Sequence, residues 1–169
     1  MPEGTRTLSL SPRRVHSAGL TYRGHLRELG ERPDPAGPAI FPRRADSLAG
    51  PEDSLPRPSV EQMIAVVNGV EPGLGDTVRR RHPQLSPLFD YEVELGVVLL
   101  EDIGEDELSG GKSRLPLGFF LANDLTARSV QILGEGAVDR MAFWSASKSF
   151  PSTLLTGPLL SRPPGCEFA

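Results

Sequence analysis

The chain has few of the features that mark secreted, membrane or nucleic-acid-binding proteins. It contains one cysteine, Cys166, so no disulfide can form within it, which is typical of a protein from a reducing compartment. Its longest apolar run, residues 117–122, is much too short to cross a bilayer. Residues 1–12 lack the apolar core of a signal peptide. We therefore expect a cytoplasmic protein with no membrane partner.

Basic residues are also scarce, with 18 Lys and Arg against 22 Asp and Glu and a net charge of −4. This balance excludes a dedicated nucleic-acid binder, which needs a basic surface. No internal repeat is visible, and 169 residues fit a single domain. Glycine and proline are abundant, at 18 and 17 residues, and favour short strands, turns and ordered loops over a helical bundle.

The clearest element is a strand over residues 90–100. Its side chains alternate, so that an apolar face lies opposite a face that carries Asp90, Glu92 and Glu94. A second, buried strand covers residues 117–123 and ends at Asp124. Beyond it the sequence predicts a short helix over 125–133, a loop over 142–148 and a strand over 154–160.

The first half of the chain has shorter signals. A short helix is expected within residues 19–30, ending at Gly30. Residues 31–58 contain seven prolines and are expected to form a loop with one edge strand near 39–41. Ser59 and Gln62 form a capping-box pattern that predicts a helix up to 68–69, within an insertion-like segment over 59–88.

Three carboxylates are candidate metal ligands. Glu92 and Glu94, two apart on one strand, point the same way about 7 Å apart and raise each other's pKa unless something neutralises them. A hard divalent cation does so, and Asp124, where the second apolar strand ends, is a third candidate ligand. The alternatives are a solvent-facing strand surface for the two glutamates and a helix N-cap for Asp124. The alternative for Arg128 is a pair with Glu94 or Asp124 as structural support.

Two further features suit catalysis. His25 and Glu28 are three apart on one helical face, so the carboxylate can orient the imidazole as a base that activates water. Lys148 follows an aromatic pair in a polar run and can stabilise an oxygen on which negative charge develops. The alternatives are a structural histidine and an exposed loop lysine.

Four segments resemble, in the same order, motifs of the fumarylacetoacetate hydrolase family. They span nearly the whole chain, residues 12–160. They are the G-x-N-Y-x-x-H-x-x-E motif at residues 19–28, D-Y-E-V-E-L-A-V-V at 90–98, A-N-D-x-(S/T)-A-R-D-x-Q at 122–131, and K-x-F-D with a later G-P at 148–158.

The resemblance implies an α+β fold that is predominantly β, a mixed β-roll with a few short helices. It implies a Mg²⁺ site, with Mn²⁺ or Ca²⁺ as alternatives, and a homodimer. The metal ligands would be Glu92, Glu94 and Asp124, and the catalytic residues His25, Glu28 and Lys148. The residues that bind substrate would be Tyr22, Arg43, Arg128 and Gln131, with Arg128, Gln131 and Lys148 contacting the substrate or supporting the metal.

The implied activity is hydrolysis of a C–C bond in an acylpyruvate or another 1,3-dicarbonyl 2-oxo acid. The alternatives are a decarboxylase or tautomerase of a small 2-oxo acid such as oxaloacetate, and a non-catalytic or fragmentary member. Several positions depart from the motifs, among them Thr21, Arg43, Ser129 and Pro151. Nothing after Pro158 matches the family's closing segment, so we expect one catalytic domain over 1–169 that is truncated at its C-terminus.

Overall fold

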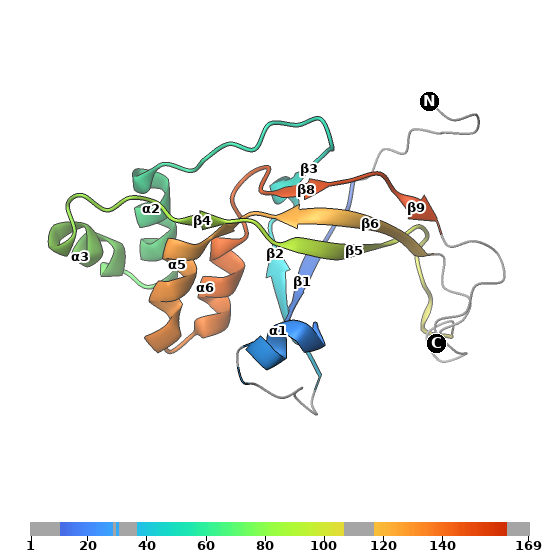
Figure 1. Ribbon diagram of the computed structural model, residues 1–169, viewed down its shortest axis with the longest axis horizontal. Helices are drawn as coiled ribbons and strands as arrows, with labels where there is room; N and C mark the ends of the chain where they lie inside the picture. Colours follow the sequence, from blue (N-terminus) through green and yellow to red (C-terminus); the bar gives the residue numbers. More distant parts are fainter. Residues whose placement is uncertain (1–10, 29, 31–36, 107–116, 162–169) are drawn as a thin grey trace.

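The computed structural model describes residues 11–28, 30, 37–106 and 117–161. The α+β class is confirmed, and helices take a somewhat larger share of the described residues than strands. Helices α2, α3, α5 and α6 lie together at one end, and the main sheet extends away from them (Figure 1). Helix α1 and the β1–β2 pair lie against the middle of the molecule (Figure 1).

The main sheet has the strand order β3-β8-β6-β5, and β9 also pairs with β6. The β3–β8 pairing is parallel, and the other pairings are antiparallel. Two smaller antiparallel pairs, β1 with β2 and β4 with β7, flank it. The strands are β1 (Val15–Gly19), β2 (Ala39–Arg43), β3 (Leu48–Ala49), β4 (Phe89–Asp90), β5 (Val93–Leu99), β6 (Leu117–Asp124), β7 (Thr126–Ala127), β8 (Leu154–Thr156) and β9 (Leu160–Ser161).

Helices α2, α3, α5 and α6 pack around one apolar cluster. Met63, Val67, Val130, Phe143 and Phe150 are nearly inaccessible to solvent there. The insertion-like segment therefore contributes α2 to the core. The helices are α1 (Arg23–Glu28), α2 (Val60–Val70), α3 (Leu74–Arg81), α5 (Arg128–Leu133) and α6 (Arg140–Ser147), with 3-10 turns η1 (Ala45–Ser47) and η3 (Gly134–Gly136). None of the described helices is long and apolar enough to cross a membrane.

The capping box is confirmed at the start of α2. The Ser59 hydroxyl accepts a hydrogen bond from the Gln62 backbone N–H, and the Gln62 side chain accepts one from the Ser59 N–H. These bonds satisfy two of the backbone donors that every helix start leaves free. Together with the apolar spacing, they explain why the helix begins at Val60.

The loop predicted over 142–148 is wrong, because this segment is helix α6. The Asp139 side chain accepts a hydrogen bond from the Ala142 N–H, which caps the helix. Phe143, Trp144 and Ser147 then lie on its buried side at helical spacing. The serines in this segment obscure the helical spacing of its buried residues in the sequence. Lys148 is the C-cap residue of the helix.

The side chains of strand β5 alternate between two faces as predicted, but the apolar face is exposed to solvent. Val93, Leu95, Val97 and Leu99, here named the apolar row, are each more than half exposed. Glu94, between them, is partly buried. In the proline-rich segment, residues 37–58 contain β2, η1 and β3 rather than one edge strand, while residues 31–36 lie outside the described residues.

Candidate active site

A buried lysine lies at the centre of the charged cluster. The Lys148 Nζ donates hydrogen bonds to Glu92 Oε2, Asp124 Oδ2 and Thr126 Oγ1, each at 2.8 Å. Its side chain is 7% exposed, so these three oxygens replace its water. We name Glu92, Asp124, Thr126 and Lys148 the acid–lysine cluster.

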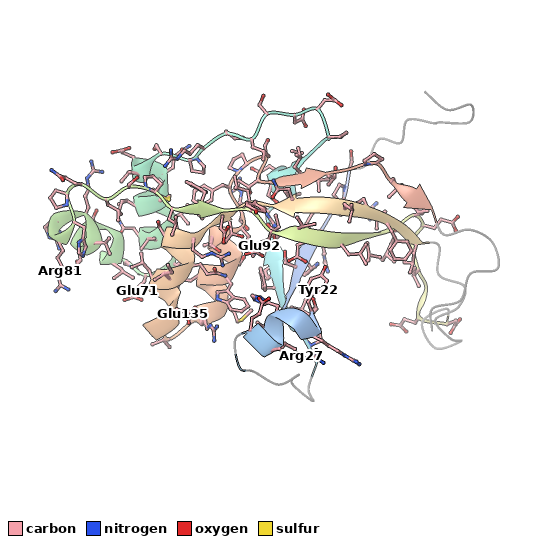
Figure 2. All side chains as sticks on the ribbon, viewed as in Figure 1. Tyr22, Arg27, Glu71, Arg81, Glu92 and Glu135 are labelled. Atoms are coloured by element: carbon pink, nitrogen blue, oxygen red, sulfur yellow. The ribbon has the colours of Figure 1, made fainter. Side chains whose placement is uncertain are left out.

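The main chain brings these residues together. Asp124 ends β6, and its backbone N–H donates a hydrogen bond to the Glu92 carbonyl at 2.8 Å, just before β5 begins. Thr126 lies two residues beyond Asp124, in β7. Lys148 reaches the same point from the end of α6. In Figure 2, Glu92 lies at the junction of β4 and β5, beside the helices.

Arg128 extends the cluster toward solvent. Its guanidinium donates to Asp90 Oδ2 and to Glu92 Oε1, both at 2.8 Å, and also to the Gln131 side chain. The Thr126 hydroxyl donates to the same Glu92 Oε1 at 3.2 Å. Glu92 is thus held by three donors on two oxygens, an arrangement that fixes its orientation.

Arg43 supports the cluster from inside. Its guanidinium pairs with Asp124 Oδ1 and donates to the Lys148 carbonyl oxygen. Its side chain is fully buried. Among the described residues, Arg43 therefore contacts Asp124 and the end of α6. The resemblance instead implies that Arg43 contacts the substrate.

Glu94 stands beside this cluster. Its carboxyl lies close to the Tyr22 hydroxyl. Burial raises the pKa of its carboxyl, and the negative charges of Glu92 and Asp124 raise that pKa further. Among the described residues, no three His, Cys, Asp or Glu side chains are grouped so that they hold a metal ion. Two of the three predicted ligands converge on one cation, and the third lies next to them.

The predicted dyad forms a loose pair on α1. His25 Nδ1 lies 3.9 Å from Glu28 Oε2, and the two side chains are 55% and 80% exposed. Within the part of the chain that the structure describes, no hydrogen bond or ion pair joins either side chain to the acid–lysine cluster. The connection between α1 and the carboxylates runs through Tyr22 instead.

Thr126 and Asp90 belong to the site, but the sequence motifs did not identify them as site residues. Thr126 is fully buried and bonded to both Glu92 and Lys148. The sequence spacing does indicate Thr126, because side chains two residues apart in an extended chain point to the same side, and Thr126 lies two residues after Asp124. Asp90 precedes Glu92 by two in the same way.

This arrangement defines a class of protein. It is an α+β fold in which carboxylates at the ends of two adjacent strands surround one buried cation, the Lys148 ammonium. The chain belongs to the fumarylacetoacetate hydrolase family, because the family model described as "Fumarylacetoacetate (FAA) hydrolase C-terminal" matches residues 14–167. This family includes hydrolases and isomerases.

Three known proteins illustrate the similarity. A caffeoylpyruvate hydrolase from Neonothopanus nambi is 31% identical over 145 residues, which are 84% of this chain and 39% of that protein. A fumarylpyruvate hydrolase from Pseudomonas aeruginosa, solved with Mn²⁺ and pyruvate, has a TM-score of 0.51 at 23% identity over 87% of this chain and 52% of its own. A 5-carboxymethyl-2-hydroxymuconate delta-isomerase from Mycobacterium smegmatis has a TM-score of 0.50 at 20% identity over 87% and 45%.

The chain spans between 39% and 50% of the length of the curated relatives it matches. The two solved structures share the fold with this chain. What the three named relatives act on is a property of those proteins.

Proposed function

We propose that this chain carries the active site of a divalent-metal-dependent hydrolase that cleaves a C–C bond in an acylpyruvate or related 1,3-dicarbonyl 2-oxo acid. The observation that carries the proposal is the convergence of Glu92 Oε2 and Asp124 Oδ2 on one cation, the Lys148 Nζ, at 2.8 Å each. Family membership and a 31% identical caffeoylpyruvate hydrolase support the substrate class.

The donor chemistry of the site fits a hard divalent ion. Carboxylate oxygens are the ligands that Mg²⁺ and Mn²⁺ take from proteins, and two of them already bracket a positive charge. Glu92, Glu94 and Asp124 would hold the ion, in exchange for the contacts that Glu92 and Asp124 make with Lys148. When bound, it would supply Lewis acidity toward two oxygens of the substrate.

The protein's own side chains carry out the remaining steps of the proposed reaction. His25, oriented by Glu28, accepts a proton from water, and the resulting hydroxide attacks the carbonyl farther from the carboxylate of the substrate. The C–C bond next to that carbonyl then breaks, and its electron pair passes to the pyruvate part as an enolate. The Lys148 ammonium stabilises the enolate oxygen, and Arg128 with Gln131 orients the substrate carboxylate.

One observation favours a second candidate, decarboxylation or tautomerisation of a small 2-oxo acid such as oxaloacetate. The acid–lysine cluster is assembled, whereas His25 and Glu28 are largely exposed and 3.9 Å apart. Decarboxylation needs mainly a metal, which the carboxylates of the cluster would hold and which would supply the electron sink, and it needs no activated water. A His25→Ala variant assayed on both substrate types separates the candidates, because only hydrolysis depends on the imidazole.

The test combines Mn²⁺ titration with turnover of fumarylpyruvate and oxaloacetate. We expect Mn²⁺ binding and metal-dependent turnover in the wild type, and loss of both in Glu92→Ala. Glu61→Ala is the matched control, because Glu61 is an exposed glutamate paired with Arg79 on the distant helices. Full activity in Glu92→Ala would contradict the proposal.

We further propose that the chain forms a homodimer through the apolar row. Four branched side chains on one strand face outward and carry no charge, so a second copy can cover them without opposing like charges. A pair of such chains related by a two-fold axis would place the same row on both sides of the contact.

A further inference from the structure

We propose that Tyr22 is a positioning residue, whose hydroxyl fastens helix α1, with His25 and Glu28, to the strand that carries Glu94. What the dyad does once it is held there rests on the proposed function. The fastening itself rests only on the contacts described below.

The Tyr22 hydroxyl contacts β5 at two neighbouring residues. It accepts a hydrogen bond from the Leu95 backbone N–H at 2.9 Å and lies close to the Glu94 carboxyl. Strand β5 pairs with β6 along one edge, and Tyr22 bonds to an amide on its other edge, which no described strand covers. In Figure 2, Tyr22 lies between α1 and β5, while Arg27 of the same helix points away.

Helix α1 has little else to hold it. It has six residues, too few for a helix that is stable alone in water. Leu26 is the one residue of Arg23–Glu28 with a buried side chain. Leu26 and the Tyr22 hydroxyl are thus the two anchors, and the hydroxyl determines where the helix sits along β5.

This role differs from the substrate contact that the resemblance implies for Tyr22. A phenolic oxygen that already accepts a hydrogen bond from Leu95 and lies close to the Glu94 carboxyl is engaged by the protein. A substrate would have to displace protein partners from it.

The chain offers a matched pair of variants, because it contains two tyrosines. Tyr22→Phe removes the fastening hydroxyl and keeps the ring. Tyr91→Phe removes a hydroxyl from a side chain that is 72% exposed and makes no hydrogen bond among the described residues. Amide hydrogen exchange, followed by mass spectrometry, is measured for both variants in the presence of a chelator.

We expect Tyr22→Phe to speed exchange in residues 23–28 and at Leu95 about fivefold, the size expected for lost hydrogen bonds, and to leave the other strands unchanged. Tyr91→Phe should match the wild type. If Tyr22→Phe and Tyr91→Phe exchange equally in residues 23–28, Tyr22 does not hold α1 and the proposal is overturned.

Turnover gives an independent readout with Mn²⁺ present. A positioning role predicts that kcat in Tyr22→Phe falls about fivefold or more while KM stays within about twofold. A raised KM at unchanged kcat, with unchanged exchange in α1, would assign Tyr22 to substrate binding and overturn the proposal. If the wild type turns over no acylpyruvate, the proposed function fails, whereas the exchange measurement still decides the role of Tyr22.

Discussion

The Lys148 Nζ lies 2.8 Å from Asp124 Oδ2, and both side chains are more than nine-tenths buried. The same ammonium reaches Glu92 Oε2 at 2.8 Å, and Arg43 pairs with the other oxygen of Asp124. Such a group is held in place from several parts of the chain at once, so removing one member leaves the remaining buried charges with fewer partners.

Lys148→Met is expected to lower the free energy of unfolding by about 3 kcal/mol at neutral pH, because Glu92 and Asp124 each lose a cationic partner at a buried site and keep only Arg128 and Arg43, respectively. Urea denaturation in the presence of a chelator measures this change. Arg79→Ala is the control, since its pair with Glu61 is exposed and is worth about 0.5 kcal/mol or less. Equal losses in the two variants would show that the lysine is not structurally essential.

The same Lys148→Met variant is expected to bind Mn²⁺ about tenfold more tightly than the wild type at neutral pH. The ammonium competes with a divalent ion for Glu92 and Asp124, and the variant has no such competitor. Isothermal titration measures the affinity, and turnover should nevertheless be lost. Weaker Mn²⁺ binding in the variant would mean that Lys148 and the ion do not share these carboxylates.

Glu94→Gln is expected to raise the melting temperature at neutral pH. Burial raises the pKa of Glu94, so the folded protein holds this proton more tightly than the unfolded chain. Wild-type stability therefore falls as the pH rises through the raised pKa, and the glutamine variant escapes this loss. Below the ordinary value of 4.5 the two proteins should melt alike.

Glu61→Gln provides a control of opposite sign. Hydrogen bonds and Arg79 hold the pKa of the Glu61 carboxyl below its ordinary value, so this variant should lose stability at neutral pH and approach the wild type in acid. Melting curves across pH, recorded with a chelator, test both glutamates. A Glu94 variant less stable than the wild type at neutral pH would contradict the prediction.

Two glycines in the same 3-10 turn provide a packing test. A Cβ on Gly134 would lie 2.4 Å from Phe143 Cβ in the core, whereas a Cβ on Gly136 would meet nothing within 4 Å. Gly134→Ala is expected to lower the free energy of unfolding by about 2 kcal/mol, and Gly136→Ala to change it by about 0.5 kcal/mol or less. Similar chemical denaturation midpoints for both variants would contradict this packing.

Val97→Asp tests the proposed dimer. Val97 is already half exposed in one chain, so the variant should fold, but the charge would be buried in a contact between two apolar rows. Light scattering should then report half the wild-type mass. Val138→Asp is the control, because Val138 is fully exposed and lies away from β5. A wild-type mass that is already monomeric would contradict the dimer.

The sequence predicted the elements whose signals are local. The capping box at Ser59, the strand ending at Asp124 and the alternation of β5 all depend on neighbouring residues. That Glu92 and Asp124 share one site was implied by the resemblance to the family motifs. Their grouping around Lys148 is a feature that only the structure displays.

The sequence could not predict properties that depend on distant partners. Alternation shows that Val93 and Leu95 share a face, but not whether that face meets the core or solvent. The surroundings of Arg43 depend on Asp124 and Lys148, which lie 81 and 105 positions further along the chain. Helix α6 was missed because its buried side includes serine and its cap precedes the predicted loop.

The parallel pairing of β3 with β8 has a consequence for biosynthesis. Leu48 and Ala49 lie beside Leu154 and Leu155, and the Thr156 hydroxyl bonds to the Ala49 carbonyl, 107 positions earlier. At ribosomal rates of about 5 to 20 residues per second, β3 waits about 5 to 20 s for its partner β8 to be synthesised. The charged site is completed late as well, because Asp124 and Lys148, the partners of Arg43, are synthesised 81 and 105 residues after it.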